Sequence, residues 1–192
     1  MVLQVVRRRV EVNAPLEAVL SLTLDAERYP EFAPSIQATE LLWHDQQNRK
    51  YLIRYTSTIP VINKTAVSEQ EVEYDLAETV FHFRETSGTF GRFEGYRRLH
   101  HLGAGCSAIE SEVRYSFGGN KFVAQLVNKA TQGVVQSNLE HIQDGIKRLA
   151  EAGQADPLHT VLGRLKVTPH MLSEQGVTEA LSGRYGIHLV PA

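Results

Sequence analysis

The sequence contains a single cysteine, Cys106, among its 192 residues. One thiol excludes an intramolecular disulfide and a metal cluster built on several cysteines. No apolar run approaches the roughly 18 residues that a membrane-spanning helix needs. The first residues lead directly into Arg7-Arg8-Arg9 without a signal-peptide pattern. We therefore expect a cytoplasmic protein with no integral membrane segment.

An excess of positive charge is also lacking, since the formal net charge is −2. No global basic field exists to attract nucleic acid, and we expect no nucleic-acid partner. Motifs that hold metals or nucleophiles are missing as well, because neither HExxH nor GxSxG occurs. His100 and His101 are adjacent on an expected strand, so they point to opposite faces and do not share a metal. We expect no metal site and no cofactor.

Local patterns predict a strand and two short helices at the start of the chain. Residues 5–12 are rich in β-branched side chains, which favours a strand. Asn13 is a good N-cap and Pro15 is tolerated in a first turn, so a helix is expected to follow up to about residue 24. Asp25 is expected to cap a second short helix, which Pro30 interrupts or ends.

Alternating side chains then predict six consecutive strands with short turns, which is typical of an antiparallel meander. Their ranges are 36–43, 50–58, 61–74, 79–85, 90–101 and 107–117. From residue 120 an apolar stripe at helical spacing continues to residue 149 and predicts one long helix. Residues 153–157 are expected to form a linker, and Thr168-Pro169 is expected to open a further short helix that ends near Gly183.

This order predicts an α+β fold, a curved antiparallel sheet wrapped around a long C-terminal helix. We divide the chain into a domain at 1–152 and a partly helical C-terminal appendage at 153–192. One helix cannot fill the concave side of such a sheet, and cavities of this kind are typical sites for small molecules. The expected partner is a hydrophobic small molecule.

Two segments carry a resemblance to a known family. Residues 12–19 and 25–34 follow the patterns Pro-x-Glu-x-Val and Asp-x-x-x-Tyr-Pro-x-Phe, and residues 88–99 contain Gly-x-Phe followed by a glycine. Over residues 3–150 the chain resembles the START-like (SRPBCC) polyketide cyclase/dehydrase and coenzyme-Q-binding superfamily. The resemblance implies a helix-grip fold around a ligand cavity. The chain differs at Arg97, where an aromatic residue is common in the family, and residues 155–192 have no recognised counterpart.

Alternation on the last strand places Ile109, Ser111, Val113 and Tyr115 on one face, which should be the cavity side. A buried hydroxyl needs a partner, so Ser111 and Tyr115 are expected to contribute polar groups to the cavity wall. The alternative is that this face only packs against the long helix. We also assign Leu126, from the apolar stripe of that helix, to the ligand site.

On the preceding strand, Phe93 and Arg97 share a face, and Phe93 suggests that this face is the inner one. A buried guanidinium needs a partner, and either Glu69 or a ligand oxygen is a candidate. The alternative is a register shift or bulge that turns Arg97 outward. Of the neighbouring strand's two faces, we expect the one with Phe81 and Phe83, rather than His82 and Arg84, to line the cavity. Tyr51 and Tyr55 share a face, and the sequence does not decide whether that face lines the pocket or lies on the outer surface.

Three functions remain. The favoured one is binding of a lipid, an isoprenoid quinone or a polycyclic molecule, because no catalytic constellation is recognisable. The first alternative is a polyketide aromatase/cyclase or dehydratase, in which Arg97, Ser111, Tyr115 and His82 supply polar contacts. The second is an interaction module, in which apolar residues of 157–192 form a homodimer or bind a partner protein, or close the cavity as a lid. Whether the protein is an enzyme stays open.

Overall fold

The structure is a computed structural model that describes residues 3–45, 47–59, 64–88, 90–116 and 121–165, with side chains of the last segment described from residue 133. Within these ranges, seven strands and four helical segments follow one another. They are β1 (Gln4–Val12), α1 (Leu16–Leu24), the 3-10 helix η1 (Ala26–Glu31), β2 (Ile36–Asp45), β3 (Lys50–Ile59), β4 (Lys64–Asp75), β5 (Val80–Ser87), β6 (Arg92–Gly103), β7 (Cys106–Ser116), α2 (Lys121–Glu151) and α3 (Leu158–Arg164).

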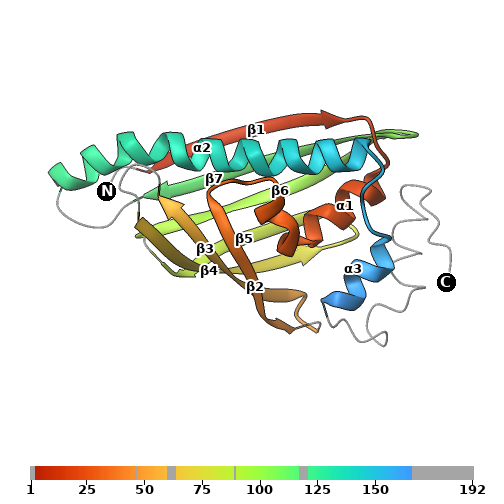
Figure 1. The fold of residues 1–192 in the computed structure, drawn as a ribbon, viewed down its shortest axis with the longest axis horizontal. Coiled ribbons are helices and arrows are strands. Elements are labelled where there is room, and N and C mark those ends of the chain that lie inside the picture. The colour runs from red at the N-terminus through yellow and green to blue at the C-terminus, as the bar shows by residue number, and fades with distance from the viewer. Residues whose placement is uncertain (1–2, 46, 60–63, 89, 117–120, 166–192) are drawn as a thin grey trace.

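All seven strands form one antiparallel sheet in the order β1-β7-β6-β5-β4-β3-β2. The six strands from β2 to β7 are a meander, and β1 returns to pair with β7. The sheet curves, and α2 runs along β1 while α1 and η1 lie on the same side of the sheet (Figure 1). The expected α+β helix-grip arrangement is therefore confirmed. The start of the strand predicted at 61–74 and the helix predicted after Thr168 lie outside the described residues.

The sheet has two faces of opposite character, because side chains alternate along each strand. The concave face is apolar, and on β7 Ile109, Val113 and Tyr115 are all buried. The convex face is charged and carries pairs such as Arg84–Glu71, 2.8 Å between Nη2 and Oε1. The main hydrophobic core forms between the concave face, α1, η1, the end of α2 and α3.

The connection between β1 and α1 differs from the expected capping. Helix α1 has Pro15 at its N-cap position and no side-chain cap, so Asn13 is not the cap. The backbone N–H of Asn13 instead donates to Glu151 Oε1 at 2.9 Å. Asp25 does precede η1, but its carboxylate does not cap that helix, and Pro30 lies inside η1. A 3-10 turn tolerates this proline because so few of its N–H groups bond within the helix.

Segment η1 is wedged between α2 and the sheet. Tyr29 is 3% exposed. The ring of Phe32 lies so close to Gly145 of α2 that a β-carbon built there would stand 2.0 Å from Phe32 Cδ2. The hydroxyl of Ser35, just after η1, bonds the side chain of Asn138 on α2. Glycine at 145 therefore sets how closely α2 approaches η1.

Helix α2 ends where Gly153 adopts a left-handed conformation, with φ of 67°. The chain then turns into α3, whose Leu158, Val161 and Leu162 are buried in the main core beside α1. The described beginning of the expected appendage thus packs on the domain. Within the described ranges, no helix is both long and apolar enough to cross a membrane.

Substitution of Gly145 tests this packing. Gly145→Ala should lower the free energy of unfolding by about 1–3 kcal/mol, because the added methyl overpacks against Phe32. Gly133→Ala, in the same helix, meets no atom of the described residues within 4 Å and should be neutral or stabilise by up to about 1 kcal/mol through helix propensity. Urea unfolding of both variants measures the difference. Equal stabilisation by both substitutions would contradict the close contact.

Candidate functional site

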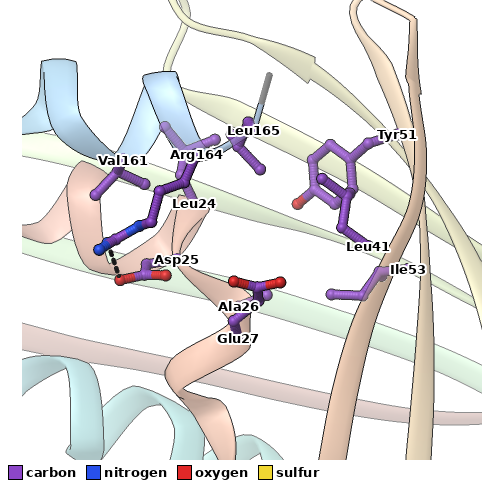
Figure 2. Close-up of a pocket in the computed structure, with 10 residues that line it drawn as sticks. All are labelled: Leu24, Asp25, Ala26, Glu27, Leu41, Tyr51, Ile53, Val161, Arg164 and Leu165. Atoms are coloured by element: carbon purple, nitrogen blue, oxygen red, sulfur yellow. Dashed lines mark hydrogen bonds and ion pairs between the residues drawn. The ribbon is translucent and has the colours of Figure 1, made fainter. Parts of the chain in front are cut away.

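A pocket lies where α3 approaches the sheet (Figure 2). Residues of α3 form one side, β2 and β3 form the opposite side, and the end of α1 with η1 lies between them. The lining residues are Leu24, Asp25, Ala26, Glu27, Leu41, Tyr51, Ile53, Val161, Arg164 and Leu165. Its volume is about 20 Å³, which is room for about one water molecule. A lipid or polycyclic molecule therefore needs more space than this pocket offers.

An ion-pair cluster holds α3 over the pocket. Arg164 bonds Asp25 Oδ2 through Nη2 and Asp156 Oδ2 through Nη1, both at 2.7 Å. Burial raises the pKa of Asp25, and the charge of Arg164 opposes that rise. The Asp25 carboxylate thus ties the start of η1 to α3.

Three tyrosines lie near one another and near Arg97 on the concave side: Tyr29, Tyr51 and Tyr55. Burial is the main cause that raises the pKa of Tyr51 well above its usual value, and the neighbouring phenols of Tyr55 and Tyr29 add to it. Burial also raises the pKa of Tyr55, while the nearby Arg97 charge lowers it. The Tyr51 and Tyr55 phenols keep their protons at neutral pH. They can therefore donate hydrogen bonds to a ligand oxygen but cannot act as bases.

His44 and Tyr74 form a second polar pair beside the pocket residue Tyr51. The His44 Nε2 and the Tyr74 hydroxyl are 2.8 Å apart, and both rings contact Tyr51. Burial lowers the pKa of His44, so the imidazole is neutral at pH 7 and can accept a hydrogen bond from the Tyr74 hydroxyl. Burial raises the pKa of Tyr74 to about 12. Throughout the described residues, no group of three or more His, Cys, Asp or Glu side chains is placed to hold a metal ion.

Arg97 points to the concave side, which settles the orientation that the sequence left open. Its Nη1 donates to the Tyr29 hydroxyl at 2.7 Å, and that hydroxyl donates to the Thr23 carbonyl at 2.9 Å. The guanidinium carbon lies 5.8 Å from the centre of the Tyr29 ring. Nε of Arg97 is buried and has no hydrogen-bond partner among the described residues. The site therefore contains a guanidinium that is held at Nη1 by Tyr29 and keeps a buried Nε–H without a partner in the described residues.

Glu69 is not the partner of Arg97. Its Oε1 accepts a hydrogen bond from Nη2 of Arg54 at 2.8 Å, and its neighbours Glu71 and Arg84 belong to the same charged convex face. Alternation along β4 places Glu69 on that face, away from Arg97. His82 is also exposed on the convex side, whereas Phe81 is buried on the concave side. His82 therefore cannot supply the polar contact to the cavity that was considered for it.

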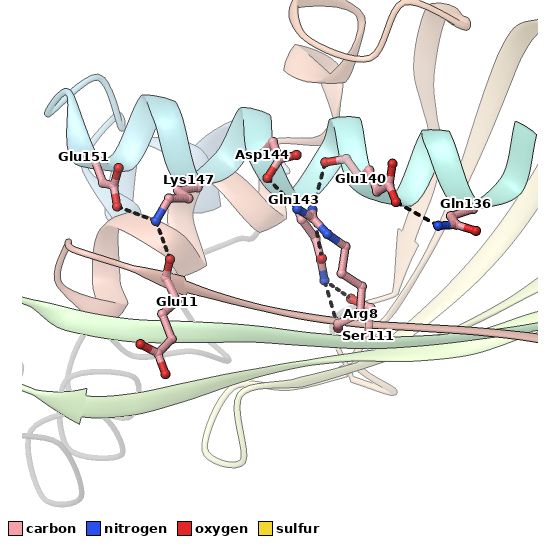
Figure 3. Close-up of polar contacts among 9 residues, drawn as sticks. All are labelled: Arg8, Glu11, Ser111, Gln136, Glu140, Gln143, Asp144, Lys147 and Glu151. Atoms are coloured by element: carbon pink, nitrogen blue, oxygen red, sulfur yellow. Dashed lines mark hydrogen bonds and ion pairs between the residues drawn. The ribbon is translucent and has the colours of Figure 1, made fainter. Parts of the chain in front are cut away.

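The predicted residues of β7 all lie on the concave face but are closed off by packing. Ile109 and Tyr115 are 0% exposed, Ser111 is 1% and Val113 is 4% exposed. The Ser111 hydroxyl accepts a hydrogen bond from Nε2 of Gln143 at 3.0 Å (Figure 3). The partner of the buried hydroxyl is thus α2 itself. These residues pack within the protein, as the alternative of contact with the long helix supposed. Their contact with a ligand stays a prediction.

Figure 3 also shows how α2 is fixed along β1. Arg8 bonds the Glu140 carbonyl at 3.1 Å and Asp144 Oδ1 at 2.7 Å. Lys147 donates to the Glu11 carbonyl at 2.5 Å. These contacts hold the second half of α2 over the β1 and β7 side of the concave face.

Phe93 lies on the concave face and is only half-buried. Its ring centre is 4.8 Å from that of Phe90 and 6.1 Å from that of Phe83. Leu126 lies in the part of α2 whose side chains are outside the described set, so its expected contact with the ligand stays a prediction.

Sequence reasoning missed Tyr29 and Gln143 as members of the site. Tyr29 belongs to the Tyr-Pro-x-Phe pattern that carried the family resemblance, so that motif was the available signal. Its bond to Arg97 spans 68 positions of the chain, and no local pattern reports a contact of that separation. Gln143 lies among the apolar positions of the helix, where a buried amide requires a polar partner, but the sequence does not indicate Ser111 as that partner.

Known proteins support the fold at the level of a family. A family model described as polyketide cyclase/dehydrase and lipid transport matches residues 4–152. No curated protein matches the chain. Among solved structures, the ZhuI aromatase/cyclase from Streptomyces sp. R1128 has a TM-score of 0.66 at 15% identity, covering 80% of this chain and 99% of its own.

Two further solved structures are similar over nearly their whole length. Protein TTHA0849 from Thermus thermophilus has a TM-score of 0.62 at 21% identity, covering 74% of this chain and 97% of its own. A START superfamily protein from Mycobacterium smegmatis has a TM-score of 0.62 at 20% identity, with coverage of 76% and 98%. At these identities the likeness shows the fold.

Alkaline titration tests the His44–Tyr74 environment. The unfolded state loses the Tyr74 proton near pH 10, whereas the folded state keeps it to about pH 12. The unfolded state therefore binds fewer protons in this window, and stability falls as pH rises from 10 to 12. Tyr74→Phe should be less stable at pH 7, because it loses the hydrogen bond to His44, but should show a shallower decline above pH 10.

Urea midpoints across pH 8 to 12 measure the two slopes. Identical slopes for the wild-type protein and Tyr74→Phe would show that Tyr74 titrates as an ordinary tyrosine.

Proposed function

Because the chain belongs to the polyketide cyclase/dehydrase and lipid-transport family, we propose that it binds a hydrophobic small molecule against the concave face of its sheet. The ligand is of the lipid, isoprenoid-quinone or polycyclic type. The site extends from Phe93 and Phe83 toward Arg97 and Tyr51. Binding of this kind needs apolar area and no reacting group.

The supporting observation is a set of aromatic side chains that the protein leaves partly open. Phe83, Phe90, Phe93 and Tyr55 are half-buried, whereas Phe81, which shares the concave face, is 3% exposed. The concave face is thus closed beside α1 and η1 and more open around Phe93. A ligand that covers about 100 Å² of these rings contributes about 2.5 kcal/mol before the costs of association.

Space for the ligand requires an enlarged pocket. The pocket beneath α3 shares Tyr51 with the tyrosine cluster around Arg97. Movement of α3 would widen this pocket on the side of Val161 and Leu165. Of the residues predicted from the sequence, Phe93 and Arg97 carry the proposal, because the four residues of β7 are already enclosed by packing.

An aromatase/cyclase reaction is the second candidate, and the His44–Tyr74 pair is the observation that favours it. Such a reaction needs a positioned acid or base. A neutral His44 has the protonation state of a base, and it contacts Tyr51 at the pocket wall. Its Nε2 is already engaged by Tyr74, however, so binding without chemistry accounts for the site more simply.

A role of residues 157–192 in a homodimer or a partner complex stays a prediction. In the described part, α3 turns Leu158, Val161 and Leu162 into the core of its own chain. These three residues therefore do not offer apolar surface to another protein while α3 is docked.

Removal of a concave ring tests the proposed binding. With the fluorescent neutral probe pyrenebutanol, Phe93→Ala should weaken binding about tenfold, because ring area that covers the probe is lost. Glu94→Ala changes the next residue of β6, which points to the convex face and pairs with Arg92. That control should bind as the wild-type protein does.

Fluorescence titration of both variants, with thermal unfolding as a check of folding, gives the comparison. No binding of the probe by the wild-type protein, or equal affinities of folded Phe93→Ala and wild type, would refute the proposed site.

A further inference from the structure

We propose that the ligand carries one acidic oxygen group, a carboxylate, which binds the guanidinium of Arg97. This inference rests on the proposed function and names the class of ligand as an apolar body with a single anionic end. The evidence is the charge of Arg97, the donors it leaves unused and the position of the chain's own carboxylates.

Arg97 makes one hydrogen bond to the described part of the protein, and it makes no ion pair there. Its partner, the Tyr29 hydroxyl, donates a hydrogen bond of its own to the Thr23 carbonyl and so offers Arg97 an acceptor oxygen but no counter-charge. Nε is buried without a partner. A partly buried guanidinium is stable when an anion accepts its remaining hydrogen bonds, and its planar fork fits a carboxylate.

Carboxylates elsewhere in the described sheet are not placed to serve Arg97. Those of the convex face pair with other cations, as Glu71 does with Arg84 and Glu112 with Arg7. Glu85 is the strand carboxylate that alternation places on the concave side among the described strands. Phe81 lies opposite Arg97 in the register, and Glu85 is four residues further along β5. That is about 13 Å at the rise of an extended strand.

The remaining segments offer few alternatives by sequence. Residues 60–63 and 117–132 contain no aspartate or glutamate. Past residue 165 the acidic side chains of the sequence are Glu174 and Glu179. These two side chains are therefore the candidates for an internal partner of Arg97 outside the described residues, and substitution removes both.

The neighbours of Arg97 are suited to a monoanion. Ser111 lies opposite Arg97 in the pairing of β6 with β7, and its hydroxyl is occupied by Gln143. Protonated Tyr51 and Tyr55 provide neutral donors. One guanidinium balances one negative charge, whereas a phosphate monoester carries about 1.5 to 2. The charge balance thus favours a carboxylate over a phosphate.

Two fluorescent probes with the same apolar body test the inference. Pyrenebutyrate carries a carboxylate and pyrenebutanol a hydroxyl. The wild-type protein should bind the acid at least about tenfold more tightly than the alcohol, the effect of a charge-assisted hydrogen bond. Arg97→Met should reduce this ratio to about one. Arg98→Met changes the adjacent, exposed arginine of the opposite face and should keep the wild-type ratio.

Each result separates the inference from the function on which it rests. If the wild-type protein binds neither probe, the proposed function itself is overturned. Equal affinities for the two probes in the wild-type protein overturn the inference and leave hydrophobic binding intact. The double variant Glu174→Gln/Glu179→Gln, made in the full chain, should keep the wild-type ratio. A tenfold higher preference for the acid in that variant would show that one of these carboxylates already occupies Arg97, and would overturn the inference.

A measurement of stability distinguishes a ligand-binding role of Arg97 from a role in stabilising the fold. If no carboxylate pairs with it in the empty protein, Arg97→Met should change the melting temperature little, because the hydrogen bond to Tyr29 is lost while a partly buried charge is removed. Pyrenebutyrate should raise the melting temperature of the wild-type protein more than that of Arg97→Met. A large loss of stability in the empty Arg97→Met protein would indicate an internal ion pair and contradict the inference.

Discussion

The register between β6 and β7 is the constraint on which the two faces of the sheet depend. It pairs Phe93 with Tyr115, Arg97 with Ser111 and Leu99 with Ile109. A slip of one residue would move every one of these side chains to the convex face. The register is fixed because Leu99 and Ile109 are enclosed in the main core. A slip of one residue would replace them there by the adjacent polar residues of the two strands, which would find no partners. The orientation of Arg97 follows from this pairing.

A second constraint is the contact of η1 with both layers. Phe32 fills the space left by Gly145 on α2, and Tyr29 reaches the sheet at Arg97. The Tyr-Pro-x-Phe segment therefore joins the long helix to the concave face. Its two aromatic residues have different tasks, since Phe32 sets the helix distance and Tyr29 fixes one donor of the guanidinium.

The sequence alone was sufficient for the six-strand meander, the curved sheet and the long helix, because alternation in the six strands and helical spacing after residue 120 are strong local signals. It could not decide the side of Arg97. Phe93 on the same face of β6 indicated the inner side, but a bulge or register shift would have turned the guanidinium outward, and alternation alone does not reveal such an irregularity. Capping by Asn13 failed because α1 begins at Leu16, which puts Pro15 and not Asn13 at the N-cap position. Contacts between Tyr29 and Arg97, or Gln143 and Ser111, depend on the assembled layers and have no local signature.

Burial of a charged group in an apolar face is costly for the empty protein and favourable once an anion binds. The same residue can therefore reduce stability and confer selectivity for a ligand. Ser111, buried at a comparable position on the neighbouring strand, differs because Gln143 satisfies it within the chain. Arg97 is the polar group of the concave face for which the described structure supplies a positioning partner but no counter-charge.

Native mass spectrometry of the protein purified from its own host tests the central claim most directly. The account predicts a co-purifying hydrophobic molecule with one acidic oxygen group, present in the wild-type protein and depleted in Arg97→Met. A protein that retains a hydrophobic molecule without an acidic group, equally in both forms, would contradict the account.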